Sequence, residues 1–239
     1  MMEIPIYVFT GLLNSGKTTL IREIIEEEDF LEPGTSLLIQ CEEGETSLDE
    51  DFLKQHQITV IPVEDSGELN EIFWHYCQRT YKPTQILIEY NGMWEMDTLF
   101  DSGMPESWLI GGIYSTVDAS TADLFLLNMR KMYMEPLRDS NLIIFNRCTD
   151  STDRIRLRRS VKALNPRTEI AFERTDGTMM EKEADAVPFD FNTNPIEIES
   201  MDYGLWYLDA MEHPERYVDK ELIFIGRFCR SVRPGEHYF

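Results

Sequence analysis

Long apolar runs are missing from this sequence. No segment approaches 18 consecutive apolar residues, and the first residues carry no signal-peptide pattern, so we expect no membrane insertion and a cytoplasmic location. Cysteine is scarce as well. The four cysteines, at positions 41, 77, 148 and 229, are far apart and form no C-x-x-C pair. This spacing argues against a disulfide framework and predicts no thiolate zinc site.

Positive charge is the second scarcity. The chain has 22 Lys and Arg against 44 Asp and Glu, which gives a formal net charge of −22. A general nucleic-acid binder is therefore excluded, because no cationic excess is left to neutralise backbone phosphates. The length of 239 residues predicts one ordinary α/β domain with, at most, a small appendage.

Residues 11–18 read G-L-L-N-S-G-K-T and fit the phosphate loop G-x-x-x-x-G-K-[ST] at every fixed position. The apolar run 4–9 predicts a buried strand before the loop, and residues 18–25 predict an amphipathic helix after it. Loop N–H groups and the helix N-terminus attract phosphate oxygens. Lys17 is expected to reach the β- and γ-phosphates, with its tip solvated when no phosphate is bound, and Thr18 to ligate Mg²⁺. The nucleotide-binding set is Gly11, Asn14, Ser15, Gly16, Lys17, Thr18 and Thr19.

Strand-like and helix-like runs alternate through most of the chain. Strands are predicted at 4–9, 37–40, 58–63, 85–89, 110–117, 142–145 and 169–172, and helices at 18–25, 48–55, 69–81, 124–137 and 154–164. Alternating elements of this kind form βαβ units. We therefore predict a doubly wound, mainly parallel α/β sheet of P-loop NTPase type, with helices on both faces.

The composition changes after the last of these strands. We predict a nucleotide-binding domain at 1–178, an acidic and polar linker at 179–199, and a helix and strand at 200–239 that resemble the start of a small β domain. Residues 230–235 look like a hairpin turn, and its return strand is expected beyond residue 239.

Five segments follow the phosphate loop in an order that resembles one group of GTPases. Residues 40–49 are similar to an N-E-F-G-E…D switch, and 86–92 to a strand ending in E-[ST]-x-G. Residues 117–119 resemble V-D-A, 142–147 the strand before N-K-x-D, and 163–166 an L-N-P motif. The order is similar to that of the CobW/HypB/UreG family of metal-linked P-loop GTPases, closest to its CobW branch, over about residues 1–175.

The resemblance implies roles for particular residues. It implies Lys17, Glu89 and Glu42 as catalytic residues, with Gly44 and Glu45 in the segment that senses the γ-phosphate. The implied magnesium ligands are Thr18, Glu89 and Glu42, and the implied base contacts are Asn146, Arg147 and Asp150.

The departures from the family pattern weaken two of its implications. Cys41 stands where the switch begins with Asn, and the C-x-C-C metal motif is absent, because residues 62–67 read P-V-E-D-S-G. The guanine-reading aspartate of N-K-x-D falls on Thr149, with Asp150 one place late, and Arg147 replaces the lysine. Asp150 reaches the base only if this loop bulges by one residue. GTP is therefore expected, with ATP left open, together with Mg²⁺.

Two functions remain open. The first is a slow GTPase that acts as a switch in metal or cofactor delivery, or in assembly of a metal-linked transporter. The second is a non-catalytic, nucleotide-dependent adaptor that docks a permease-type or other protein. A metalloprotein or permease component is the expected partner, and a homodimer is left open.

Overall fold

The computed structural model describes residues 3–27, 29–180, 189–226, 229–230 and 237–238. The chain divides into two compact units: 1–152 with 167–180, and 153–166 with 181–239. The two units are described separately below.

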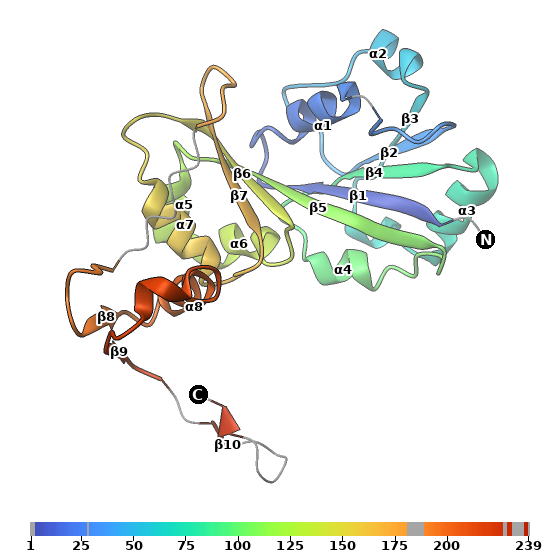
Figure 1. The fold of residues 1–239 in the computed structure, drawn as a ribbon. Helices are drawn as coiled ribbons and strands as arrows, with labels where there is room; N and C mark the ends of the chain where they lie inside the picture. The colour runs from blue at the N-terminus through green and yellow to red at the C-terminus, as the bar shows by residue number, and fades with distance from the viewer. Residues whose placement is uncertain (1–2, 28, 181–188, 227–228, 231–236, 239) are drawn as a thin grey trace. The chain divides into compact units, whose positions relative to one another are not determined.

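A parallel sheet of seven strands forms the first unit, in the order β3-β2-β4-β1-β5-β6-β7 (Figure 1). Every neighbouring pair in it is parallel. The strands are β1 (Ile4–Thr10), β2 (Ser36–Gln40), β3 (Ile58–Pro62), β4 (Gln85–Glu89), β5 (Trp108–Asp118), β6 (Leu142–Cys148) and β7 (Glu169–Arg174). The predicted α/β fold with a parallel sheet of P-loop NTPase type is confirmed.

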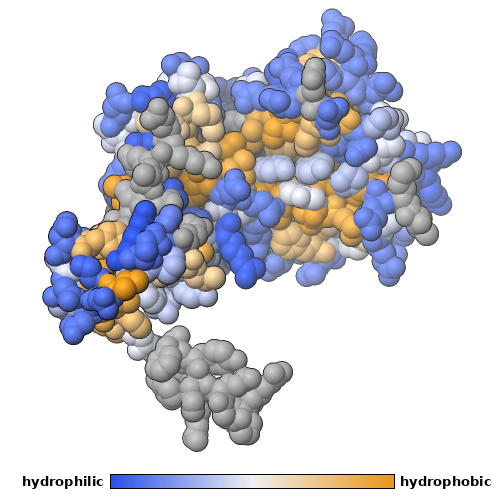
Figure 2. All heavy atoms as spheres, viewed as in Figure 1, coloured by the Kyte–Doolittle hydropathy of each residue, from blue (hydrophilic) through white to orange (hydrophobic). Residues whose placement is uncertain are grey.

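Helices cover both faces of this sheet because successive strand side chains point to opposite sides. On one face α1 (Lys17–Glu26) and α2 (Glu50–Gln55) pack Ile21 and Phe52 against Leu87. On the other, α3 (Glu71–Tyr81) and α4 (Met96–Phe100) pack Trp74 and Leu99 against the sheet. A short 3₁₀ turn, η1 (Ser66–Glu68), precedes α3. Figure 2 shows hydrophobic side chains gathered along the sheet and hydrophilic ones over α2. The sheet's central strands are therefore buried on both sides.

The single helix predicted at 124–137 is instead three pieces: α5 (Ala122–Asn128), α6 (Arg130–Met134) and the 3₁₀ turn η2 (Glu135–Leu137). The break falls at Met129, where φ is −139°. The Asn128 side chain donates to the Leu124 carbonyl at 2.9 Å, and such side-chain bonds compete with the helix. Pro136 then disfavours a regular helix around it.

The second unit has a small core of its own. It contains α7 (Arg154–Lys162), β8 (Ile196–Ile198), α8 (Tyr203–Glu212), the turn η3 (Pro214–Tyr217) and β9 (Leu222–Phe224), which pairs in parallel with β8. Phe189, Ile196 and Ile198 are buried against Trp206. Part of the segment expected as a linker therefore carries a buried strand; residues 181–188 lie outside the described residues.

The C-terminal residues differ from the prediction. In place of the one strand predicted within 200–239, the structure has β9 and the separate β10 (Cys229–Arg230). The return strand, expected beyond the end of the chain, is β11 (His237–Tyr238), which pairs antiparallel with β10. The predicted turn falls at 231–235, outside the described residues.

Candidate nucleotide site

The phosphate loop joins β1 to α1 at the middle of the sheet, where β1 has β4 on one side and β5 on the other. Three loop residues have positive φ: Gly11 (138°), Asn14 (59°) and Gly16 (103°). Asn14 thus adopts the left-handed conformation, which asparagine tolerates better than most residues. Ser15 Oγ lies 2.7 Å from the Thr116 hydroxyl on β5 and fixes the loop to the sheet.

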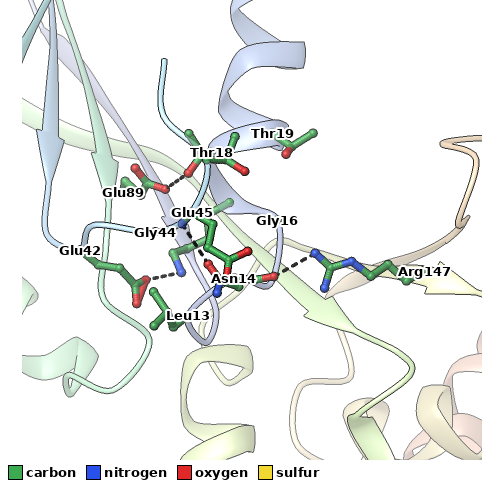
Figure 3. A pocket seen from close by; sticks show the side chains of 12 residues that line it. Leu13, Asn14, Gly16, Thr18, Thr19, Glu42, Gly44, Glu45, Glu89 and Arg147 are labelled. Carbon is green, nitrogen blue, oxygen red and sulfur yellow. Dashed lines mark hydrogen bonds and ion pairs between the residues drawn. The ribbon is translucent and has the colours of Figure 1, made fainter. Parts of the chain in front are cut away.

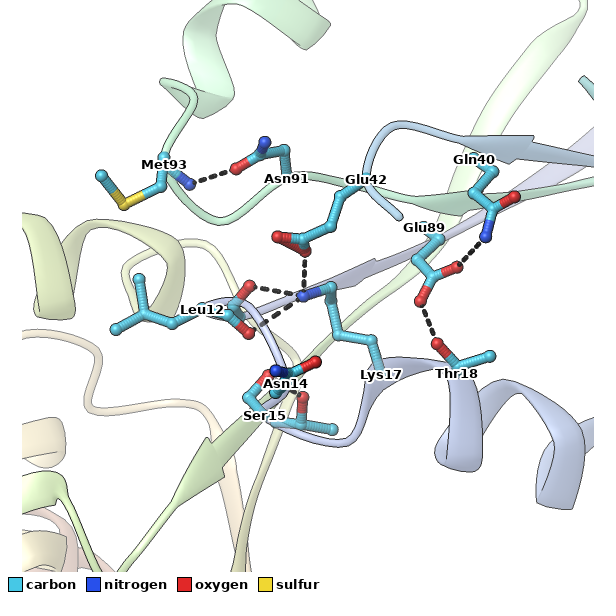
Figure 4. Close-up of polar contacts among 12 residues, drawn as sticks. Leu12, Asn14, Ser15, Lys17, Thr18, Gln40, Glu42, Glu89, Asn91 and Met93 are labelled. Atoms are coloured by element: carbon cyan, nitrogen blue, oxygen red, sulfur yellow. Dashed lines mark hydrogen bonds and ion pairs between the residues drawn. The ribbon is translucent and has the colours of Figure 1, made fainter. Parts of the chain in front are cut away.

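Lys17 is only 4 % exposed, so the expectation of a solvated lysine tip is wrong. Its Nζ donates to the carbonyls of Gly11 at 2.8 Å and Leu12 at 3.0 Å, and forms an ion pair with Glu42 (Figure 4). Sequence reasoning missed this arrangement because Glu42 comes from the segment after β2. A buried ammonium needs such partners to offset its lost hydration.

Thr18 and Glu89 meet at the ends of α1 and β4. The Thr18 hydroxyl donates to Glu89 Oε1 at 2.5 Å (Figures 3 and 4). Gln40 Nε2 donates to Glu89 Oε2 at 3.4 Å (Figure 4). Glu89 is 3 % exposed, and its burial raises the pKa of the carboxyl above its ordinary value. Gln40 is a contact that sequence reasoning missed; its position at the end of a neighbouring strand is the signal that would have suggested it.

A hydroxyl and a carboxylate this close are the hard oxygen donors that Mg²⁺ prefers, so the pair fits that ion. Among the described residues no group of three or more His, Cys, Asp or Glu side chains could hold a metal by itself. Thr18 and Glu89 would therefore share the ion with phosphate oxygens and water, as is usual for Mg²⁺. The structure places the third expected ligand, Glu42, on Lys17 instead.

A cavity of about 80 Å³ lies above these residues, and the switch segment forms one wall of it. Figure 3 shows Glu45 and Gly44 facing the phosphate loop. The Glu45 N–H donates to Asn14 Oδ1 at 3.3 Å. The switch segment therefore touches the phosphate loop through both Glu42 and Glu45.

The segment after β4 also contacts the phosphate loop, through backbone alone. A Cβ added to Gly92 would lie 2.2 Å from the Gly11 carbonyl oxygen and 2.9 Å from the Leu12 nitrogen. No side chain fits between the two segments at that distance. Glycine at position 92 is thus required by a close backbone approach.

The end of β6 forms the side of the site where the base is expected. Asn146 Nδ2 donates to the Ser15 carbonyl at 2.6 Å. Arg147, at φ 53°, donates to the Asn14 carbonyl at 3.0 Å and forms an ion pair with Asp118. Asn146 and Arg147 therefore reach the phosphate loop, and Asp118 is a residue that sequence reasoning matched without assigning it a role.

The one-residue bulge that an inward Asp150 requires is present, because the β6–β7 register shifts between Phe145 and Cys148. It does not bring Asp150 inward. The Asp150 carboxylate is 88 % exposed and pairs with Arg174 at 2.7 Å. Thr149, at the position of the family aspartate, pairs its hydroxyl with Ser151 at 2.8 Å.

The three cysteines whose side chains the structure describes, Cys41, Cys77 and Cys148, are buried. Burial, with the Glu89 carboxylate nearby, raises the pKa of Cys41 to about 12. Such thiols are poor metal ligands, because a thiolate is the binding form.

The described residues contain no helix with the length and the apolar character that a membrane span requires.

Known proteins share this architecture. The chain is similar to the Zn(II)-bound YjiA GTPase of E. coli, with 21 % identity and a TM-score of 0.53, over 76 % of this chain and 64 % of that one. It is also similar to the hydrogenase maturation factor HypB of Archaeoglobus fulgidus, with 16 % identity and a TM-score of 0.50, over 74 % and 84 % of the two chains. At these identities the likeness establishes the fold alone. The chain spans less than two thirds of the length of the YjiA GTPase, and no relative among the curated proteins matches it.

A model of the CobW/HypB/UreG nucleotide-binding domain matches residues 5–172, which include the phosphate loop, the switch segment, Glu89 and Asn146. This span covers well over half of the chain. The protein therefore belongs to the CobW/HypB/UreG family, through its nucleotide-binding domain.

Proposed function

We propose that this chain binds GTP together with Mg²⁺ and hydrolyses it slowly, as a cytoplasmic switch in metal or cofactor delivery or in the assembly of a metal-linked transporter. The observation that carries the proposal is the convergence of Lys17, Thr18 and Glu89 beside one cavity at the ends of β1 and β4. Membership of a GTPase family supports the reaction type.

Phosphoryl transfer to water requires position and charge more than covalent chemistry. Lys17 and the loop N–H groups bind the β- and γ-phosphates. Thr18 and Glu89 hold Mg²⁺, which would offset charge that builds on the β–γ bridge. A γ-phosphate at Lys17 would replace Glu42, so the switch segment would move when a triphosphate binds.

We expect slow turnover because the described residues that line the phosphate cavity include a single arginine, Arg147, and its side chain is already engaged. The guanidinium of Arg147 is held by Asp118 and by the Asn14 carbonyl. An arginine that stabilises the transition state is worth several orders of magnitude in rate, so its absence from the γ-phosphate leaves a low rate.

The same observation favours a second candidate, a nucleotide-dependent adaptor that docks a metalloprotein or permease component and hydrolyses little. Its partner would recognise the switch segment in the triphosphate-bound arrangement. The alternative that we propose for the partner is a second copy of this chain, which would form a homodimer.

Phosphate release over many turnovers separates the two candidates. GTP and ATP are each supplied with Mg²⁺, with and without Zn²⁺ or Ni²⁺. Sustained release that falls roughly 100-fold in Thr18→Val but not in Thr80→Val, whose side chain is exposed on α3, supports the enzyme. Tight GTP binding with release no faster than in Thr18→Val supports the adaptor. Bound nucleotide at a hundredfold excess over Kd should stabilise the protein by about 2.7 kcal/mol and raise its melting temperature. If neither GTP nor ATP raises the melting temperature, both candidates are contradicted.

A further inference from the structure

A second cavity of about 150 Å³ adjoins the phosphate site. The two cavities share Gly16, Thr19 and Arg147 in their walls. A nucleotide whose phosphates lie against Lys17 and Thr18 therefore has this cavity next to its sugar. We take it as the base end of the proposed nucleotide site, so the inference below rests on the proposed function.

The cavity has one carboxylate on the strand beside Asn146. In the β6–β7 register Phe145 lies opposite Phe172, and their rings stack at 5.3 Å. The next residues, Asn146 and Glu173, therefore lie on the other face of the sheet, and both line the cavity.

Two arginines line this wall, and each is paired with a carboxylate outside the lining, Arg147 with Asp118 and Arg174 with Asp150. Asn146 uses its Nδ2 on the Ser15 carbonyl, and its buried Oδ1 has no hydrogen-bond partner among the described residues. Partial burial and the nearby Glu23 carboxylate raise the pKa of Glu173, while Arg147 opposes that shift. A ligand edge that carries N–H donors would satisfy these acceptors.

The residue expected to supply the acid lies elsewhere. Asp150 is absent from the lining of this cavity, and its exposed carboxylate is paired with Arg174. Two described carboxylates line the cavity, Glu23 on α1 and Glu173 on β7. Glu173 is the one on the strand beside Asn146, whose side chain reaches the phosphate loop.

We propose that Glu173, and not Asp150, reads the guanine edge by accepting hydrogen bonds from N1–H and the 2-amino group. Guanine has these two donors side by side, which matches the two oxygens of one carboxylate. Adenine presents an N1 lone pair and a C–H at the same places, so it would leave the carboxylate unpaired and repelled. A site built on such bonds rejects the analogue that lacks the donors.

The test exchanges the carboxylate for an amide and changes the base to match. Binding of GTP, ATP and xanthosine triphosphate is measured by competition on the wild type, Glu173→Gln and the control Asp150→Asn. Glu173→Gln should weaken GTP binding by roughly 10- to 100-fold. It should also gain binding of xanthosine triphosphate, whose C2 carbonyl accepts from the new amide. Asp150→Asn should keep the wild-type order.

Melting temperatures show whether the variants fold. Unfolding also cannot explain tighter binding of xanthosine triphosphate by Glu173→Gln. Unchanged GTP preference in Glu173→Gln overturns the assignment while leaving the proposed function intact, as does a switch to xanthosine triphosphate in Asp150→Asn. Equal GTP and ATP affinities in the wild type also overturn it. A wild type that binds no triphosphate removes the proposed function and the assignment together.

Discussion

Lys17 and Glu42 form a buried ion pair across the phosphate site, although Lys17 begins α1 and Glu42 lies in the segment after β2. Their side chains are 3 % and 8 % exposed. The carboxylate occupies a place next to the lysine that a phosphate oxygen would take. We therefore expect phosphate binding to displace the segment that carries Glu42.

Lys17→Ala should abolish triphosphate binding and also destabilise the protein. Removing one partner of a buried pair leaves the Glu42 charge uncompensated, at a cost of roughly 3–5 kcal/mol. Urea unfolding and calorimetry with GTP measure the two effects. The double variant Lys17→Ala/Glu42→Gln should recover most of the stability and none of the binding. A stable single variant would show that the ion pair contributes little.

Glu42→Gln alone should bind the triphosphate more tightly when Mg²⁺ is chelated, by roughly 10-fold, because the amide competes less well than a carboxylate for Lys17. Equilibrium binding of a fluorescent GTP analogue measures the affinity. Glu43→Gln, an exposed neighbour, is the matched control. Weaker binding in Glu42→Gln under these conditions would mean that Glu42 helps to hold the nucleotide.

Glu89→Gln should stabilise the magnesium-free, nucleotide-free protein at neutral pH. Burial raises the pKa of Glu89, so its contribution to stability is fully present below the ordinary pKa of 4.5 and is lost as pH rises through the raised value. The advantage of the variant should therefore vanish as the pH falls below about 4.5. Urea unfolding from pH 4 to 8 measures it, and a pH-independent difference would contradict this cause. Mg²⁺ should no longer strengthen nucleotide binding in the variant.

Gly92→Ala should damage the phosphate loop from outside it. The added methyl group would lie 2.2 Å from the Gly11 oxygen, so one backbone must shift. We expect a loss of roughly 1–3 kcal/mol of stability and at least tenfold weaker triphosphate binding. Gly67→Ala is the control, because its Cβ meets only an exposed Asp65 oxygen at 3.1 Å. Equal stability and equal triphosphate affinity of the two variants would show that the backbones at Gly92 and Gly11 move apart at little energetic cost.

The buried thiols should be inert in the native protein. With the pKa of Cys41 near 12, about one thiol in ten thousand is ionised at pH 8. In a Cys229→Ser background, a disulfide reagent should react with the three remaining cysteines only after unfolding.

The protein should contain no stoichiometric zinc after dialysis against a chelator, as measured by elemental analysis. Retained zinc would show that the fold brings the distant cysteines together.

Local sequence predicted those parts of the site that depend on neighbours in the chain. The strand, the loop and the helix around Lys17 are specified by eight consecutive residues and their apolar flanks. Glu42 against Lys17 and Glu173 beside Asn146 depend on strand order and register, which no local pattern encodes. Asp150 shows the same limit. The sequence indicated that Asp150 needs a bulge to reach the base, but Arg174, which pairs with Asp150, comes from the neighbouring strand β7.

The contact of Gly92 with Gly11 also limits how the two loops can move. No side chain separates the two backbones, so a change of side-chain rotamer cannot relieve their contact. Met93, the next residue, is 57 % exposed and lines a surface groove with Met129. We therefore expect a shift of the Gly11 backbone to displace Gly92 and, with it, the neighbouring Met93 at the molecular surface.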